Sequence, residues 1–203
     1  MKKLLTTLLI STVVFGGVQA VSAQDVIGEG EADIEINGTL GADNTDPDTT
    51  IPETDEDWIN VTLPTDTIFY NKADDPIIKA PTYAIINNSG RPVKVSVAGF
   101  AASSANPTEP GDFNLNLLVS GTPGHAATTE STSLVLNGSL QGPTSELITL
   151  ANCVDQYIKA DAQSLKGDAK NNVATFTYGG SATATTALKL NYTLTLKFDA
   201  VGF

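Results

Sequence analysis

The fold is decided by the stretch PTYAIINNSGRPVKVSVAGF, which runs from Pro81 to Phe100. Its second half places a valine at every second position from Val93 to Val97, which is the pattern of a strand with one buried and one solvated face. Residues 82–87 form a second apolar strand pattern. Between the two patterns lies Asn87-Asn88-Ser89-Gly90, and Asn and Gly accept a positive φ at the lowest cost. The stretch therefore predicts two strands joined as a β-hairpin.

Short strand patterns of the same kind recur along the rest of the chain. The longest runs from Leu188 to Phe198, where apolar residues alternate strictly with Lys, Asn and Thr. Apolar runs on both sides of Asn137-Gly138 predict a further hairpin. The spacing over residues 150–158 fits a turn or two of helix and an irregular strand about equally. We predict an all-β fold, an Ig-like or jelly-roll-like antiparallel β-sandwich of about eight or nine strands.

The first residues have the layout of a secretory signal peptide, covering Met1 to Ala23. Two lysines precede an apolar run from Leu4 to Val18, which is too short for a membrane span, and small residues follow. We expect cleavage before Gln24, with a second candidate site after Ala20. The protein is therefore predicted to be secreted or held at the surface of a bacterial cell.

The next segment, residues 24–57, is predicted to hold a short strand and an acidic linker before the sandwich domain of residues 58–203. Ala32, Ile34 and Ile36 alternate with acidic residues, which indicates the strand. Residues 42–57 are rich in Asp, Thr and Pro, which indicates a linker, and we expect residues 38–57 to be mobile in the monomer and to contribute little to folding.

Three carboxylates of this linker, Asp43, Asp46 and Asp48, are weak candidates for a calcium site, because hard oxygen ligands lie close together there. The Gly and the closing Glu of an EF-hand loop are missing at the required spacing.

Trp58 follows the linker directly. A ligand-stacking role is one interpretation, but no second aromatic lies beside it, so an aromatic that closes the edge of the core is favoured.

The charge and the reactive residues limit the functional classes. The net charge is −12, and removal of residues 1–23 takes away two lysines and no acid, which gives −14. Such a surface repels nucleic acids and anionic lipid. His125 is the single histidine and lies in a Gly/Pro loop; Cys153 is the single cysteine, so no disulfide forms within the chain. No GxSxG, HExxH or CxxC motif occurs, and we predict a protein without catalytic residues or cofactor.

Three segments together resemble a known group of proteins: INVTLPTDTIFY (Ile59 to Tyr70), the stretch from Pro81 to Phe100, and YTLTLKF (Tyr192 to Phe198). With the acidic linker TDPDTTIPETDED, they are similar to the secreted β-sandwich proteins of Gram-positive bacteria that are encoded alongside WxL-domain surface proteins. The chain departs from the WxL motif itself, because it has Trp58-Ile59-Asn60 in place of Trp-x-Leu. The resemblance implies a location at the cell wall and contacts with other surface proteins or cell-wall polymer.

We therefore expect a non-catalytic structural or adhesion-type protein. The alternative is a fibre or pilin-like subunit that donates its Asp33–Gly38 strand to the sheet of a neighbour, as against pairing within its own sandwich. A carbohydrate-active or calcium-binding module is a third, less favoured interpretation. A Lys–Asn isopeptide crosslink through Lys94, Lys189 or Lys197 is not expected, because these lysines lie opposite the apolar face of their strands and predict solvated ammonium groups.

Overall fold

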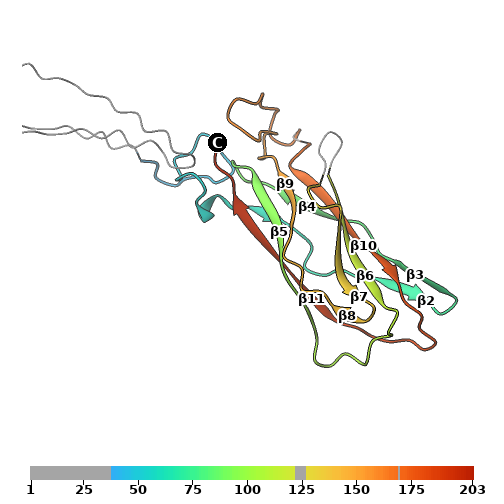
Figure 1. Cartoon of the computed structure of the whole chain (residues 1–203). Helices are drawn as coiled ribbons and strands as arrows, with labels where there is room; N and C mark the ends of the chain where they lie inside the picture. Colours follow the sequence, from blue (N-terminus) through green and yellow to red (C-terminus); the bar gives the residue numbers. More distant parts are fainter. Residues whose placement is uncertain (1–37, 122–126, 169) are drawn as a thin grey trace, which may run out of the picture.

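The computed structural model describes residues 38–121, 127–168 and 170–203. This part of the chain forms eleven β-strands and one 3-10 turn, η1 (Glu56–Trp58). All strand pairs are antiparallel, and the strands form two sheets that face each other (Figure 1). The predicted all-β antiparallel sandwich is thus confirmed. Within the same ranges, no helix is long and apolar enough to cross a membrane.

The larger sheet carries eight strands. Its main path is β1 (Val61–Thr62), β4 (Tyr83–Asn87), β10 (Val173–Ser181), β6 (Asn114–Gly121), β7 (Ser131–Leu136) and β8 (Ser139–Leu140). The two remaining strands branch from β10, as β3 (Asp75–Lys79) and its partner β2 (Tyr70–Lys72). The smaller sheet has the order β11 (Tyr192–Ala200), β5 (Val93–Ala102) and β9 (Glu146–Leu150).

The core lies between the two sheets and is built by the inward rows of their strands. On β5, Val93, Val95 and Val97 are buried, while Lys94 and Ser96 between them are half-buried on the other face. Opposite them, β6, β7 and β10 supply the apolar residues Leu115, Leu117, Val119, Leu134, Ala174 and Phe176. The period-2 pattern of the sequence is therefore the pattern of burial.

The predicted hairpin between residues 82–87 and Val93 is wrong in its pairing. Both strands form, but β4 belongs to the larger sheet and β5 to the smaller one, so the turn crosses from one sheet to the other. Asn87 is fully buried in this turn, and its side-chain amide donates to the carbonyl oxygens of Arg91 and Ala151, at 2.9 and 2.8 Å. None of residues 87–90 has the positive φ on which the hairpin prediction rested, and the Asn87 side chain instead replaces main-chain hydrogen bonds inside the protein.

The hairpin at Asn137-Gly138 is confirmed. Both residues have a positive φ, 50° and 70°, as a type I′ turn requires, and the turn joins β7 to β8. Two other details differ from the prediction. Residues 150–158 contain turns and bends in place of helix, and β11 begins at Tyr192, not at Leu188.

Candidate binding groove

One side of the sandwich is open along β11, the edge strand of the smaller sheet. Among the described strands, β11 pairs with β5 alone, so its other edge has no strand partner. Its inward row is only half-buried and consists of Tyr192, Leu194, Leu196 and Phe198. The equivalent row of β5, from Val93 to Val97, is at most 2% exposed. The core is thus incompletely covered along this edge.

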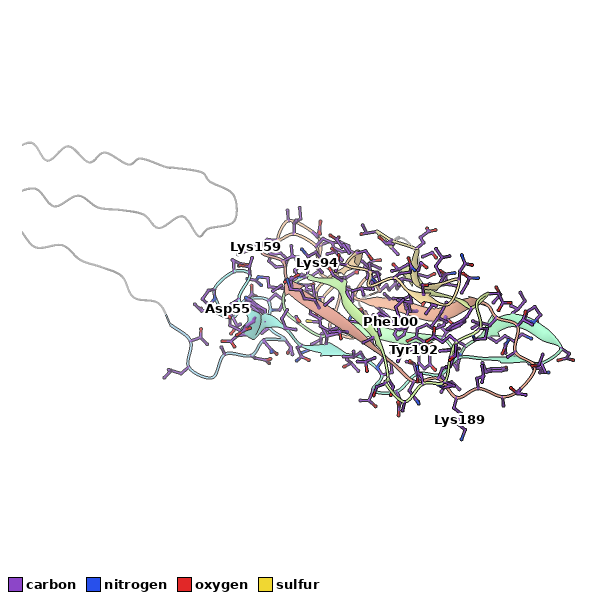
Figure 2. The ribbon with its side chains drawn as sticks, turned by 60° about the horizontal axis from the view of Figure 1, so that its bottom comes forward. Asp55, Lys94, Phe100, Lys159, Lys189 and Tyr192 are labelled. Atoms are coloured by element: carbon purple, nitrogen blue, oxygen red, sulfur yellow. The ribbon has the colours of Figure 1, made fainter. Side chains whose placement is uncertain are left out.

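A groove of about 780 Å³ follows this open side, and we call it the β11 groove. One wall is β11, and the other is the segment of residues 63–69, which we call the strap. The base includes Phe100, Leu115, Phe176 and Tyr178. Phe100 and Tyr192, which lie close together in Figure 2, stack with ring centroids 5.0 Å apart. The size falls within the range of binding clefts in proteins. Most of the lining residues are apolar or aromatic, but the surface that they and the Thr, Asn and Asp residues expose to the groove is more polar than apolar.

The strap is held by few contacts. Its backbone makes no hydrogen bond to another main-chain group in the ranges that the structure describes. The Thr67 hydroxyl lies 3.0 Å from the Tyr178 hydroxyl, and the Ile68 amide donates to the Tyr83 hydroxyl at 2.7 Å. Ile68 and Leu63 are 62% and 41% exposed. The strap is thus attached near its C-terminal end, through phenol groups of the larger sheet and through Phe69, whose ring packs against Tyr178 and Tyr192.

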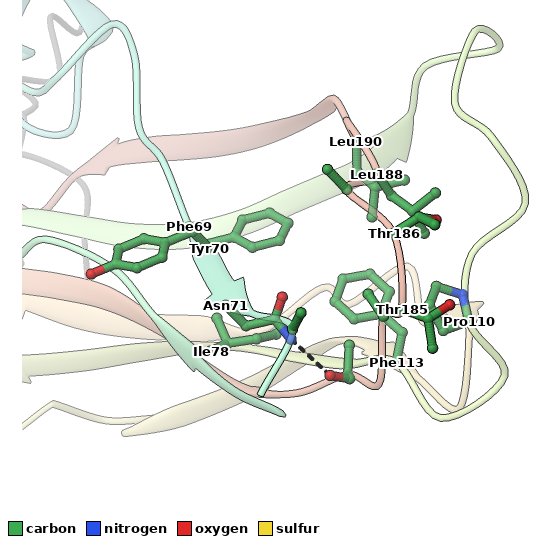
Figure 3. Close-up of a pocket in the computed structure, with 14 residues that line it drawn as sticks. Phe69, Tyr70, Asn71, Ile78, Pro110, Phe113, Thr185, Thr186, Leu188 and Leu190 are labelled. Atoms are coloured by element: carbon green, nitrogen blue, oxygen red, sulfur yellow. Dashed lines mark hydrogen bonds between the residues drawn. The ribbon is translucent and has the colours of Figure 1, made fainter. Parts of the chain in front are cut away.

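A second cavity, of about 310 Å³, continues the groove beyond the start of β11, and we call it the terminal pocket. Phe69 and Leu190 line both cavities. Figure 3 shows Phe69, Phe113 and Leu188 around the terminal pocket, where the rings of Phe69 and Phe113 are 6.1 Å apart. The Asn71 side chain lies in its lining but donates to the Ala182 carbonyl oxygen at 2.7 Å, so this amide is already occupied. The terminal pocket therefore suits an apolar side chain.

Few ionisable groups line the groove in the described part of the chain. Asp66 is the single carboxylate among the described residues that line it. Tyr192 donates to Glu109 at 2.5 Å, and burial together with this carboxylate raises the pKa of Tyr192. Burial also raises the pKa of Tyr178. Both phenols stay neutral through the physiological range, and the surface they present suits the binding of apolar side chains.

The three calcium candidates are not brought together around a common point. Asp43 accepts from the amide and hydroxyl of Thr45, at 2.9 and 2.8 Å, and these hydrogen bonds lower its pKa. Asp46 accepts from the amide of Asp48 at 3.0 Å. In the described part of the chain, no three His, Cys, Asp or Glu side chains are placed to hold a metal ion. Asp43 and Asp46 instead stabilise turns of the acidic segment.

The acidic segment, expected to be a mobile linker, is docked against the sandwich from Asn44 onward. Arg91, which is 6% exposed, binds Glu53 through two nitrogens, at 2.9 and 2.7 Å, and donates to the Pro47 carbonyl oxygen at 2.8 Å. Its guanidinium carbon lies 4.2 Å from the ring centroid of Trp58 and 4.5 Å from that of Phe203. We call Glu53, Trp58, Arg91 and Phe203 the end clamp. It fixes the acidic segment and the last residue of the chain to the same end of the sandwich (Figure 1).

Trp58 closes the core at this end, as favoured from the sequence. Its side chain is fully buried, and its Nε1 donates to the Pro52 carbonyl oxygen at 3.0 Å. Cys153 is free and buried nearby, where its thiol donates to the Thr45 carbonyl oxygen at 3.1 Å and burial raises its pKa.

The lysines considered for a crosslink have exposed ammonium groups. Lys94 and Lys197 pair with Asp199, at 3.8 and 2.7 Å, with side chains 39% and 63% exposed, and Lys189 is exposed. His125, the strand pattern from Ala32 to Ile36 and the predicted signal peptide lie outside the described residues.

The sequence did not reveal the β11 groove. The alternation of Tyr192 to Phe198 indicates a half-buried strand, but it does not say which strand lies at an edge of the sheet. Comparison of the chain with family models, with curated proteins and with solved structures finds no match.

Proposed function

We propose that this protein is a non-catalytic, secreted or cell-surface structural or adhesion-type protein that acts through contacts with other proteins. The contact, in this proposal, is the addition of an extended protein segment to the β11 groove. The observation that carries the proposal is the combination of an unpartnered β11 edge with a groove beside it, into which the half-buried apolar row of β11 faces. In strand addition, main-chain hydrogen bonds supply affinity, and pockets for alternate side chains supply specificity.

The chemistry of the groove supports a protein ligand over a polymer of another kind. Its walls offer aromatic and aliphatic surface, and a single carboxylate, Asp66, among the described lining residues. The net charge of −12 opposes the approach of nucleic acids and other anionic polymers. An extended peptide with an apolar side chain at every second position meets both conditions, because its backbone is neutral and its apolar row is buried.

The proposed location rests on the sequence. Residues 1–23 have the charge and hydropathy pattern of a secretory signal, and the likeness to proteins encoded beside WxL-domain proteins suggests the Gram-positive cell surface. Cell fractionation tests this part: we expect the protein in the wall and culture fractions, and recovery from the cytoplasm alone would contradict it.

Hydrogen exchange of the β11 amides tests the binding mode. Peptides with alternating apolar residues, added in a panel, are expected to slow exchange at residues 192–200. The variant Leu194→Lys, which puts a charge into the groove, should abolish this protection. The matched control Thr195→Lys, on the outward face of the same strand, should retain it. Equal protection in both variants, or none with any peptide, would contradict strand addition.

A further inference from the structure

The segment that fits the β11 groove best is part of this chain. We propose that residues 31–37 of a second copy add to the β11 edge, so that the protein assembles with itself; this inference rests on the proposed function above. Ala32, Ile34 and Ile36 form an apolar row with the period of two residues that an extended strand presents on one face. The inward row of β11, from Tyr192 to Phe198, has the same period along the groove.

The direction of the strands favours a second copy over the chain's own segment. β11 runs toward the end clamp, because Val201, just after it, donates to the Pro92 carbonyl oxygen. The blue start of the described chain lies near this same end, beside the C-terminus (Figure 1), and the Asn44 carbonyl oxygen accepts from Gly90 there. To enter its own groove, the preceding segment would have to turn back and run parallel to β11.

In a neighbour stacked in line on this end, the same segment enters from the terminal-pocket side and runs antiparallel to β11. Antiparallel pairing is the more stable of the two arrangements per residue. The tether is short, since only residues 38–43 separate the donated segment from Asn44, which accepts hydrogen bonds from Gly90 and Asn60. Six residues span about 20 Å at most. The subunits must therefore stack end to end, and such head-to-tail contacts build open filaments.

The charges outside the apolar row limit which strands can pair. The outward face of the donated segment carries Glu31, Asp33 and Glu35, and on the outward face of β11 Lys197 pairs with Asp199 at 2.7 Å. The acidic face in turn opposes pairing between two donor segments.

Leu40 extends the apolar row on the tether. It has the same parity as Ile34 and Ile36, and it is fully exposed in the single chain. In the stacked arrangement, this part of the tether lies at the mouth of the neighbour's terminal pocket. Phe69, Phe113 and Leu188 line that pocket and offer an apolar site for the Leu40 side chain.

The test compares the mature chain, starting at Gln24, with two variants, by analytical ultracentrifugation over a wide concentration range and by negative-stain microscopy. The wild-type chain should form linear oligomers as concentration rises. Ile34→Asp with Ile36→Asp should remain monomeric at least tenfold above the wild-type assembly concentration. The matched control Asp33→Asn with Glu35→Gln alters only the outward face and should still assemble. A wild-type chain that stays monomeric throughout would overturn the inference.

A peptide covering residues 28–40, added to the Ile34→Asp and Ile36→Asp variant, separates this inference from the proposed function. The peptide should slow hydrogen exchange of the β11 amides, and a scrambled peptide should not. If unrelated alternating peptides protect β11 but this one does not, the self-assembly inference fails and strand addition stands. If no peptide protects β11, both fail.

Discussion

The two irregular segments on either side of β1 are held in very different ways. Residues 43–58, before β1, dock through the buried Trp58 ring and the Arg91–Glu53 ion pair. The strap, after β1, touches the larger sheet through the Tyr178 and Tyr83 hydroxyls. The first segment is the more acidic and polar of the two, yet it is the one that closes the sandwich.

This difference shows that composition does not decide whether a segment docks. The acidic segment ends in Trp58, whose side chain is fully buried. Its Glu53 carboxylate pairs with the buried Arg91 guanidinium. Both features come from the turn after β4, which brings Gly90 and Arg91 to the end of the sandwich. In the strap, Phe69 alone of the large side chains packs against the core, and Leu63 and Ile68 remain partly in solvent.

The largest effect is expected from removal of the Trp58 ring. Trp58→Ala should lower the free energy of unfolding by about 3–5 kcal/mol, because it leaves a cavity at a fully buried site and removes the contact with Arg91. Ile68→Ala in the strap, where the side chain is 62% exposed, should change it by no more than about 0.5 kcal/mol. Urea unfolding measures both. Similar losses in the two variants would remove the contrast between the segments.

A methyl group at Gly90 tests how closely the acidic segment packs. A Cβ there would lie 2.8 Å from Cζ3 of Trp58 and 2.9 Å from the main-chain carbon and oxygen of Asp46. Gly90→Ala should therefore destabilise the protein by about 1–3 kcal/mol. In the control Gly99→Ala, the nearest neighbour of the new Cβ, on Thr195, is 4.0 Å away, so no loss is expected. Equal thermal midpoints for both variants would show that residues 43–58 are not closely packed.

The contrast between the acidic segment and the strap also shows which features of the fold can be predicted from the sequence. Alternation identified most strands, because burial on one face is a local pattern, and positive-φ residues located the Asn137-Gly138 hairpin. Pairing across the turn after Asn87 was wrong, since β4 pairs with β10, and β5 pairs with β11 and β9, which all lie far away in the chain. β3, with the sequence DPIIK, was missed, because it is short and contains a proline. The docked linker and the β11 groove both depend on contacts between residues far apart in the chain.

Acid should weaken the end clamp. Hydrogen bonds from Arg91 are the main cause that lowers the pKa of Glu53 below its ordinary value of 4.5. A carboxyl group with a lowered pKa in the folded state adds stability that is complete above its unfolded pKa and is lost as pH falls through the folded pKa. At pH 7, Glu53→Gln should cost about 1 kcal/mol, between the values for an exposed ion pair and a buried charged hydrogen bond.

Unfolding curves from pH 7 down to pH 3 measure this effect. The difference between wild type and Glu53→Gln should shrink below pH 4.5, as the wild-type carboxyl group takes up its proton. Asp75→Asn is the control: its carboxylate pairs with Lys79 on an exposed hairpin, so little change is expected at any pH. A constant difference across the range would mean that Glu53 stabilises the clamp by packing alone.

The smallest effect on stability is expected from the hydrogen bond between the strap and the larger sheet, which joins Thr67 to Tyr178. Thr67→Val keeps the branched shape of the side chain and removes the hydroxyl that lies 3.0 Å from the Tyr178 hydroxyl. The loss in unfolding free energy should be about 0.5–1 kcal/mol, since Thr67 is only half-buried and water can replace part of the bond. Limited proteolysis should respond more strongly, with faster cleavage within residues 63–69, because local opening of the strap requires no global unfolding. Thr65→Val, at an exposed position of the same segment, is the matched control and should leave both measurements unchanged. If cleavage of the strap is as slow in Thr67→Val as in wild type, the contact with Tyr178 does not hold this wall of the β11 groove in place.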